Sequence, residues 1–256
     1  MGKTALITGA SSGIGEEFAY RLAQQNVNLV LVARSEEKLN LLADQVKQYG
    51  IEATVLPYDL SIEYAGTKVF EMTEALGIQV DMLINNAGFA LSGILTDIDP
   101  EQDHRQVMLN VNAVVDLTHA YLPGMIERGT GAIINLASTV SFQPVPHMAV
   151  YGATKAFVLS FSEAIWQEYH DKGIDVLALC PGATDTNFFE TAGDVAFGKI
   201  RTPHQVVDTA LKALKGRKSF VVDGKRNYLT AQLSRILPRK TVVSIAGKLA
   251  KPGRKM

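Results

Sequence analysis

The chain has 256 residues, of which 47% are hydrophobic and 20% charged, and its formal net charge is -1. These values are ordinary for one globular domain, and the near-zero charge gives no reason to expect a nucleic acid or another polyanion as a partner. The single cysteine, Cys180, excludes an internal disulfide and fits a reducing cytoplasm, while no apolar run approaches the roughly 18 residues of a membrane span.

The chain opens with a predicted strand, a glycine-rich turn and a helix. Residues 3–8 are a short apolar run rich in β-compatible residues, so no signal peptide is expected before them. Gly9, Gly13 and Gly15 follow directly, and a helical pattern comes next. Glycines at such a turn let the backbone approach a pyrophosphate, and the helix N-terminus faces the phosphates. The order therefore predicts a dinucleotide site at the start of the chain.

The rest of the chain alternates strands with helices. Further strands are expected at 28–33, 53–58, 80–85, 132–137, 175–179 and 219–222. Most of these runs are continuously apolar, which indicates a parallel sheet covered on both faces. Ser35 and Asp99 stand where helices should begin. We therefore expect a single-domain α/β fold, a doubly wound seven-stranded parallel sheet with its site at the carboxyl ends of the strands.

Three side chains that can move a proton stand at a fixed spacing in the second half of the chain. Ser138 precedes Tyr151 by thirteen residues, and Lys155 follows Tyr151 by four. The sequence from 151 to 166 reads as helix, so Tyr151 and Lys155 share a face. A free tyrosine ionises near pH 10, so acid–base work at neutral pH needs about 4 kcal/mol of phenolate stabilisation, part of which the ammonium can supply. A pair at this spacing also arises by chance on exposed helices, so the assignment depends on the rest of the chain.

Several motifs together resemble the short-chain dehydrogenase/reductase family along nearly the whole chain. In family order and spacing they are Thr8-Gly9-x-x-x-Gly13-Ile14-Gly15, Asp59-Leu60, Asn85-Asn86-Ala87-Gly88, Asn110, Ser138, Tyr151 to Lys155, and Pro181-Gly182 with Thr186. The resemblance implies a Rossmann-type catalytic domain over 1–224, with a substrate lid at 185–201. It also implies a nicotinamide-dependent oxidoreductase that interconverts a ketone or aldehyde and an alcohol, as a homodimer or homotetramer.

The same resemblance implies which residues hold the cofactor. Asp59 matches the residue that binds the adenine amino group, and Thr186 matches one that binds the nicotinamide carboxamide. The full set is Gly9, Ser11, Ser12, Gly13, Ile14, Arg34, Asp59, Leu60, Asn86, Ala87, Gly88, Tyr151, Lys155, Pro181, Gly182, Thr184 and Thr186. Asn85 has a purely structural alternative, in which its side-chain amide ties neighbouring strands.

The end of the second strand predicts which cofactor is bound. Relatives that use NAD carry Asp or Glu there, which binds the adenosine ribose and repels a 2′-phosphate. This chain has Ala33-Arg34-Ser35, and a guanidinium can pair with a phosphate through charge-assisted hydrogen bonds. NADP(H) is therefore expected, although Ser12 stands where many NADP(H) relatives have a basic residue. The alternative is that Arg34 is only a solvated surface charge.

Each reacting group also receives a role from the resemblance. For reduction, Ser138 would hold the substrate carbonyl oxygen, Tyr151 would donate the proton, and Lys155 would lower the pKa of the phenol and hold the ribose hydroxyls. The fourth catalytic residue is Asn110, whose backbone carbonyl would bind a water that connects Lys155 to solvent. Asn112 is the alternative for this role.

The substrate side of the site is expected to be apolar. Its expected contacts are Ser138, Phe142, His147, Met148, Tyr151, Phe188 and Phe189. His147 is interpreted as a wall residue, because Tyr151 already fills the acid–base role. An apolar ketone, aldehyde or secondary alcohol fits such a wall better than a sugar or a nucleotide does. No metal ligands are predicted.

Residues 225–256 extend beyond the seventh strand and contain nine Lys or Arg residues but no Asp or Glu. Apolar residues such as Leu229 and Leu233 recur among them at helical spacing. The favoured interpretation is a helical extension packed on the domain with solvated lysines. A peripheral contact with an anionic membrane, or a cover over a substrate channel, is the alternative.

The function predicted from these features is that of a cytoplasmic NADP(H)-dependent carbonyl reductase or alcohol dehydrogenase. Two alternatives belong to other classes of protein. One is a non-catalytic NADP(H)-sensing protein on the same fold, which would usually have lost the tyrosine or the lysine that this chain retains. The other is a membrane-associated binding protein that acts through the basic tail.

Overall fold

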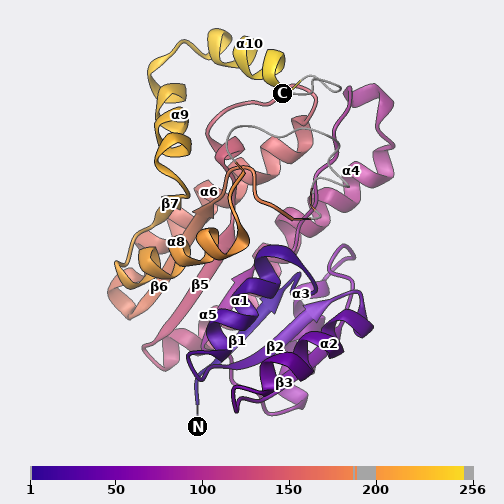
Figure 1. Cartoon of the computed structure of the whole chain (residues 1–256), viewed down its shortest axis with the longest axis vertical. Coiled ribbons are helices and arrows are strands. Elements are labelled where there is room, and N and C mark those ends of the chain that lie inside the picture. Colours follow the sequence, from indigo (N-terminus) through magenta and orange to yellow (C-terminus); the bar gives the residue numbers. More distant parts are fainter. Residues whose placement is uncertain (1, 187, 189–199, 251–256) are drawn as a thin grey trace.

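The computed structural model describes residues 2–186, 188 and 200–250. Seven strands form one parallel sheet in the order β3-β2-β1-β4-β5-β6-β7 (Figure 1). Their bounds are β1 Thr4–Thr8, β2 Asn28–Ala33, β3 Ala53–Pro57, β4 Met82–Asn85, β5 Gly131–Leu136, β6 Ile174–Cys180 and β7 Phe220–Val222. All seven expected strands are present, with ends displaced by no more than two residues, and the doubly wound parallel sheet is confirmed.

Helices cover both faces of the sheet, because successive residues of each strand point to opposite sides. One layer holds Ile7 and Leu31 against α1 (Gly13–Ala23), α2 (Glu36–Lys47) and α8 (Pro203–Lys215). The other holds Leu6 and Val30 against α3 (Ala65–Ala75), α5 (Ala113–Glu127) and α6 (Ala149–Tyr169). Two buried apolar layers therefore fix the sheet, and the site is left at its carboxyl edge.

Two of the helix starts were predicted from their capping residues. The Asp99 carboxylate accepts a hydrogen bond from the Glu101 amide at 3.0 Å and so caps α4 (Pro100–Val107). Ser35 precedes α2 as expected, but its hydroxyl makes no capping hydrogen bond. The position of this helix start was therefore right, whereas the side-chain cap did not form.

The helix that carries Asn110 is interrupted by a π-helical turn, Met108–Asn112, between α4 and α5. At its end the Ala113 amide donates to the Met108 carbonyl, one residue further back than in an α-helix. Asn110 is only 1% exposed, whereas Asn112 is exposed. Such turns often mark functional sites, and nothing in the sequence predicted this one.

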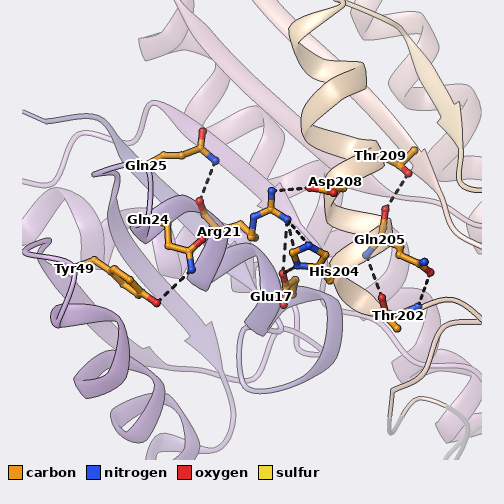
Figure 2. A network of polar contacts seen from close by, with 10 residues as sticks. All are labelled: Glu17, Arg21, Gln24, Gln25, Tyr49, Thr202, His204, Gln205, Asp208 and Thr209. Atoms are coloured by element: carbon orange, nitrogen blue, oxygen red, sulfur yellow. Dashed lines mark hydrogen bonds and ion pairs between the residues drawn. The ribbon is translucent and has the colours of Figure 1, made fainter.

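Ion pairs hold α8 against α1 at the far side of the glycine turn (Figure 2). Arg21 of α1 contacts Asp208 at 2.6 Å, and Glu17 contacts His204 at 2.9 Å. Ahead of α8, the Arg201 guanidinium makes two bonds of 2.8 and 2.9 Å to the buried carboxylate of Asp223, just after β7. These contacts fix the chain that follows the expected lid, most of which lies outside the described residues.

The chain's cysteine lies in the buried interior, at the end of a strand. Cys180 ends β6 and is fully buried. Burial raises the pKa of its thiol far above the ordinary value. Cys180 is therefore an inert packing residue.

After β7 the chain forms two further helices, α9 (Lys225–Ile236) and α10 (Arg239–Leu249), separated at Leu237 and Pro238. Both lie at the end of the molecule away from the N-terminal half (Figure 1). In the described part of the chain, no helix has the length and apolar character needed to cross a membrane.

Candidate active site

A large pocket of about 1390 Å³ lies at the carboxyl ends of the strands. Every residue that the sequence assigned to the cofactor lines it, from Gly9 near the start of the chain to Thr186 after β6. Segments that are far apart in the sequence therefore meet where a doubly wound sheet binds its ligands. The role of each residue stays a prediction, but their assembly into one pocket is a property of the fold.

The glycine turn is packed too closely for larger residues. Gly9 and Gly13 have φ of +62° and +61°, in the left-handed region that favours glycine. A Cβ atom at Gly15 would lie 2.3 Å from the Gly9 carbonyl oxygen, and one at Gly13 would lie 2.8 Å from Cγ2 of Thr186. The first contact lets α1 approach its strand, and the second brings the loop after β6 over the turn.

A small polar network joins the ends of β1 and β4 at the floor of the pocket. The Thr8 hydroxyl accepts the amides of Asn86 and Ala87 at 2.9 and 3.0 Å. The Asn86 side chain in turn donates to the carbonyls of Thr8 and Gly9 at 2.9 and 3.1 Å. Asn86 thus holds the glycine turn in place.

Asn85 has the structural role that was left open as an alternative. Its side chain donates to Oδ1 of Asn135 at 2.8 Å, and Asn135 donates to the Ser162 hydroxyl at 2.9 Å. All three residues are buried. This chain of hydrogen bonds ties β4 to β5 and to α6, the helix that carries Tyr151 and Lys155.

One end of the pocket combines two cations with a carboxylate. Arg34, Ser35 and Lys38 line it, together with Asp59. Among the ion pairs of the described residues, none joins Arg34 to the neighbouring acids of α2, so its guanidinium is available at the pocket edge. An anionic group fits this end of the pocket.

Asp59 is held as a carboxylate. Its Oδ1 accepts the amide and the hydroxyl of Ser61 at 2.9 and 2.7 Å, and its Oδ2 lies 3.3 Å from Arg105. Burial raises the pKa of Asp59, but the Ser61 hydrogen bonds and the charges of Arg34 and Arg105 outweigh it, so the pKa is lowered. The sequence did not point to Arg105, because only the packing of α4 brings it to the end of β3.

Ser138, Tyr151 and Lys155 converge on the opposite wall of the pocket, and all three are buried. Ser138 follows β5, while Tyr151 and Lys155 lie one turn apart on α6. Burial raises the pKa of Tyr151 to about 12, against a lowering from its hydrogen bond with Ser138. The protein alone therefore does not lower the pKa of the phenol, contrary to the expectation from the Tyr–Lys spacing.

The position of Lys155 accounts for the absence of a lowered pKa at Tyr151. Its Nζ donates to the Leu136 carbonyl at 2.6 Å and lies 5.9 Å from the centroid of the Tyr151 ring. Burial lowers the pKa of Lys155 to about 8, and no ion pair among the described residues includes it. A buried cation without a carboxylate partner is costly, and such strained groups are concentrated at functional sites.

Asn110 lies directly behind Lys155 rather than in the pocket lining. A Cβ atom on Gly88 would meet Asn110 Oδ1 at 3.0 Å and Lys155 Nζ at 3.5 Å, so both side chains abut the same glycine. The Asn110 amide donates to the Phe89 carbonyl at 2.9 Å and to the Thr154 hydroxyl at 3.2 Å. Of the two candidate asparagines, Asn110 is the one placed beside the lysine.

The substrate side of the pocket is apolar, as expected, but not all of the predicted residues form it. Met148 and Phe188 line it, with the Phe188 ring centroid 5.7 Å from that of Tyr151. Phe89 and Leu91 line it as well. Phe189 lies outside the described residues.

Phe142 and His147 are placed elsewhere. The Ser138 hydroxyl caps a tight turn, Thr139–Phe142, which directs the Phe142 ring toward Phe220 of β7 at 6.1 Å between centroids. His147 lines a separate cavity of about 220 Å³, next to Leu91. The prediction that both residues line the cleft was therefore wrong. For Phe142 the reason is the tight turn after Ser138, which the sequence analysis did not include.

The last described residues return to this side of the site. Ala250 is fully buried in a cluster with Val140, Met148 and Tyr151. A Cβ atom on Gly247 would lie 3.0 Å from Cγ of Pro146. The end of α10 therefore packs on the wall that carries Tyr151.

Comparison with known proteins gives a consistent result. A family model described as short chain dehydrogenase matches residues 3–195. The ketoacyl reductase HetN from Nostoc sp. is 30% identical over 92% of this chain and 83% of its own. A short-chain dehydrogenase from Sphingobium yanoikuyae in complex with NADPH is 36% identical, with a TM-score of 0.83 over 91% of this chain and 92% of the other. A bulky-bulky ketone specific alcohol dehydrogenase from Comamonas testosteroni is 32% identical, with a TM-score of 0.78 over the same shares.

Proposed function

The chain belongs to the short-chain dehydrogenase family of oxidoreductases, and from this premise we propose that it interconverts an apolar ketone or aldehyde and the corresponding alcohol with NADP(H). The observation that carries the proposal is the buried group of Ser138, Tyr151 and Lys155 on the wall of the pocket that collects all the expected cofactor residues. When bound, the reduced nicotinamide supplies the hydride.

The side chains have separate tasks in this proposal. The Ser138 hydroxyl, already within hydrogen-bonding reach of Tyr151, orients the substrate carbonyl oxygen toward the phenol. The Tyr151 phenol donates its proton to that oxygen as negative charge develops there. Because burial raises the pKa of the phenol to about 12, Tyr151 is fully protonated at neutral pH, as a proton donor in the reductive direction should be.

Lys155 and Asn110 restore the proton. With its pKa lowered to about 8, the lysine can exchange a proton near neutral pH more readily than an ordinary lysine. Its ammonium is held by the Leu136 carbonyl and would also bind the ribose hydroxyls. Asn110 lies behind it at a π-helical turn, where a backbone carbonyl can accept from water. Asn110 and Lys155 thus form a route for one proton from solvent to the Tyr151 phenol.

Three observations support NADP(H) as the cofactor. Arg34 and Lys38 bring two positive charges to the end of the pocket beside Asp59. Ala33 occupies the position where a carboxylate would repel a 2′-phosphate, and the Ser35 hydroxyl is not used in capping. The similar protein from Sphingobium yanoikuyae is a complex with NADPH.

Ala33→Asp is expected to reverse the cofactor preference. The new carboxylate repels a 2′-phosphate and pairs with Arg34, so kcat/KM for NADPH should fall roughly 10–100-fold, the equivalent of one charge-assisted interaction, while that for NADH rises. Initial rates with both cofactors measure the change. Asn40→Asp adds the same charge to an exposed position of α2 outside the pocket and is the control. Unchanged NADPH kinetics in Ala33→Asp would exclude this end of the pocket as the phosphate site.

The apolar substrate is inferred from the pocket wall and from the relatives. Phe89, Leu91, Met148 and Phe188 offer a broad apolar surface beside Tyr151. One relative is a ketoacyl reductase and another is specific for bulky-bulky ketones. We therefore extend the proposal to ketones with large apolar groups. A homodimer or homotetramer in the cytoplasm remains part of it.

The direct test is NADPH oxidation, followed by absorbance, with a panel of ketones of increasing apolar size. We expect turnover that improves with apolar bulk and depends on Tyr151. NADPH binding without turnover of any ketone or aldehyde would instead favour the second candidate, a non-catalytic NADP(H)-binding protein. The retained Tyr151 and Lys155 argue against that candidate.

A further inference from the structure

Helix α9 presents its apolar side chains to solvent and its small or polar ones to the protein. Leu229, Leu233 and Ile236 are 64%, 52% and 79% exposed. On the opposite side, Ala231 is buried, and Asn227 donates to the Asp223 carbonyl at 2.8 Å. This is the reverse of an ordinary surface helix, in which the apolar stripe faces the core.

Helix α10 continues this pattern. Ile245 and Leu249 are 46% and 47% exposed, whereas Gly247 and Ala250 face the protein. We call the exposed set the apolar stripe; it consists of Tyr228, Leu229, Leu233, Ile236, Leu237, Ile245 and Leu249. Of the sixteen exposed large hydrophobic residues in the described chain, seven belong to it. So dense a group marks a binding surface rather than scattered surface leucines.

The charges around the apolar stripe identify what it binds. The exposed cations on the two helices include Lys225, Arg226, Arg235, Arg239 and Lys240. The described chain from 225 to 250 contains no acidic residue. A second copy that packed through the same face would bring these cations against one another, which disfavours a contact between two apolar stripes.

We propose that the apolar stripe and its cations form a peripheral binding surface for an anionic phospholipid bilayer. Exposed leucine and isoleucine side chains enter the acyl boundary, while lysine and arginine contact the lipid phosphates. The two helices lie at one end of the molecule, where a planar surface can reach them (Figure 1). The sequence favoured a helical extension packed on the domain with solvated lysines. The two helices do pack on the domain, but through small residues such as Ala231 and Ala250, so that their large apolar residues face solvent together with the cations.

This placement would set the active site beside the lipid. Ala250 at the end of α10 packs in the same cluster as Tyr151 and Met148. A bound bilayer would therefore lie close to the apolar side of the pocket, where a membrane-dissolved substrate could enter. The lipid contact itself does not depend on the proposed activity.

Vesicle co-sedimentation of the full chain tests the proposal. We expect binding to vesicles of phosphatidylcholine mixed with phosphatidylglycerol, weaker binding to pure phosphatidylcholine, and loss of binding as salt is raised. The double variant Leu229→Gln with Leu233→Gln should lower the affinity at least ten-fold, because each leucine loses its apolar contact. Arg235→Gln with Arg239→Gln should lower the affinity roughly 25-fold, at about five-fold for each charge.

Matched substitutions on α2 provide the control. Leu41 is 60% exposed and Lys47 is exposed on that helix. Leu41→Gln and Lys47→Gln therefore remove one exposed leucine and one exposed cation from another surface and should leave vesicle binding unchanged. Turnover of a water-soluble ketone reports that the variants fold. Absence of binding to anionic vesicles would overturn the proposal. Vesicle binding that is unchanged by Leu229→Gln with Leu233→Gln would overturn it as well. Dissociation of an oligomer by Leu229→Gln with Leu233→Gln, seen by sedimentation velocity, would identify a contact between copies and overturn it as well.

Discussion

Tyr151→Phe is expected to lower the turnover number for ketone reduction by about 10²–10⁴-fold, the usual contribution of a positioned general acid. Phenylalanine keeps the ring that packs 5.7 Å from Phe188, so the pocket wall and the fold should persist. Only the proton donor is removed. The affinity for NADPH, measured by fluorescence titration, should therefore fall far less than kcat does, since Tyr151 is one of many residues expected to contact the cofactor.

Tyr121→Phe is the matched control for this experiment. Tyr121 is also a buried tyrosine whose pKa burial raises to about 12, but it lies on α5 and its hydroxyl meets Thr73 at 2.8 Å. Loss of that contact should lower the free energy of unfolding by about 1 kcal/mol and leave turnover unchanged. Turnover in Tyr151→Phe within ten-fold of the wild type would show that another group delivers the proton.

Lys155→Met is expected to abolish most turnover and, at the same time, to stabilise the cofactor-free protein. Burial lowers the pKa of the ammonium from 10.5 to about 8, which corresponds to a cost on the order of 3 kcal/mol at neutral pH. Methionine fills a similar volume without a charge, at the loss of the bond to the Leu136 carbonyl, worth about 1–2 kcal/mol. Thermal unfolding at pH 7 should show that the free energy of unfolding rises by about 1–2 kcal/mol. Each kcal/mol corresponds to a rise in Tm of roughly 2–4 °C.

The gain in stability of Lys155→Met over the wild type should depend on pH. Between about pH 8 and pH 10.5 the unfolded lysine still carries its proton while the folded one does not, so the wild type gains stability as pH rises through this window. The difference in Tm between variant and wild type should therefore shrink from pH 7 to pH 10. Lys68→Met, on an exposed lysine that pairs with Glu71, should show no such trend. A difference that widens with pH would contradict a buried ammonium at position 155.

The sequence was most informative where local chemistry decides the structure. The seven strands could be placed from their apolar runs, because a parallel sheet buries both of its faces. The tight turn after the first strand could be placed from its glycines, because only residues without a Cβ atom fit there. The residues expected to hold the cofactor also meet in one pocket, because most of them follow a strand end or belong to the glycine turn. The N-cap at Asp99 formed for the same local reason.

The features that the sequence could not predict depend on packing between distant segments. Phe142 turned away from the cleft because the Ser138 cap started a tight turn. Arg105 reached Asp59 only through the position of α4. The amphipathic pattern of α9 was visible, but the side of the helix that faces solvent is set by the contact of Asn227 and Ala231 with the body. Likewise, a spacing of four residues could not reveal that burial would raise, rather than lower, the pKa of Tyr151.

The buried thiol at the end of β6 can serve as a probe of how often this part of the protein opens. Cys180 is the chain's single cysteine, is fully buried and stands next to Pro181 of the pocket. A thiol reagent can therefore reach it only when the structure around the end of β6 opens. The labelling rate of the unmodified protein thus reports how often that opening occurs. Added NADPH should slow the reaction in proportion to its occupancy of the pocket, so affinity can be read without any engineered label.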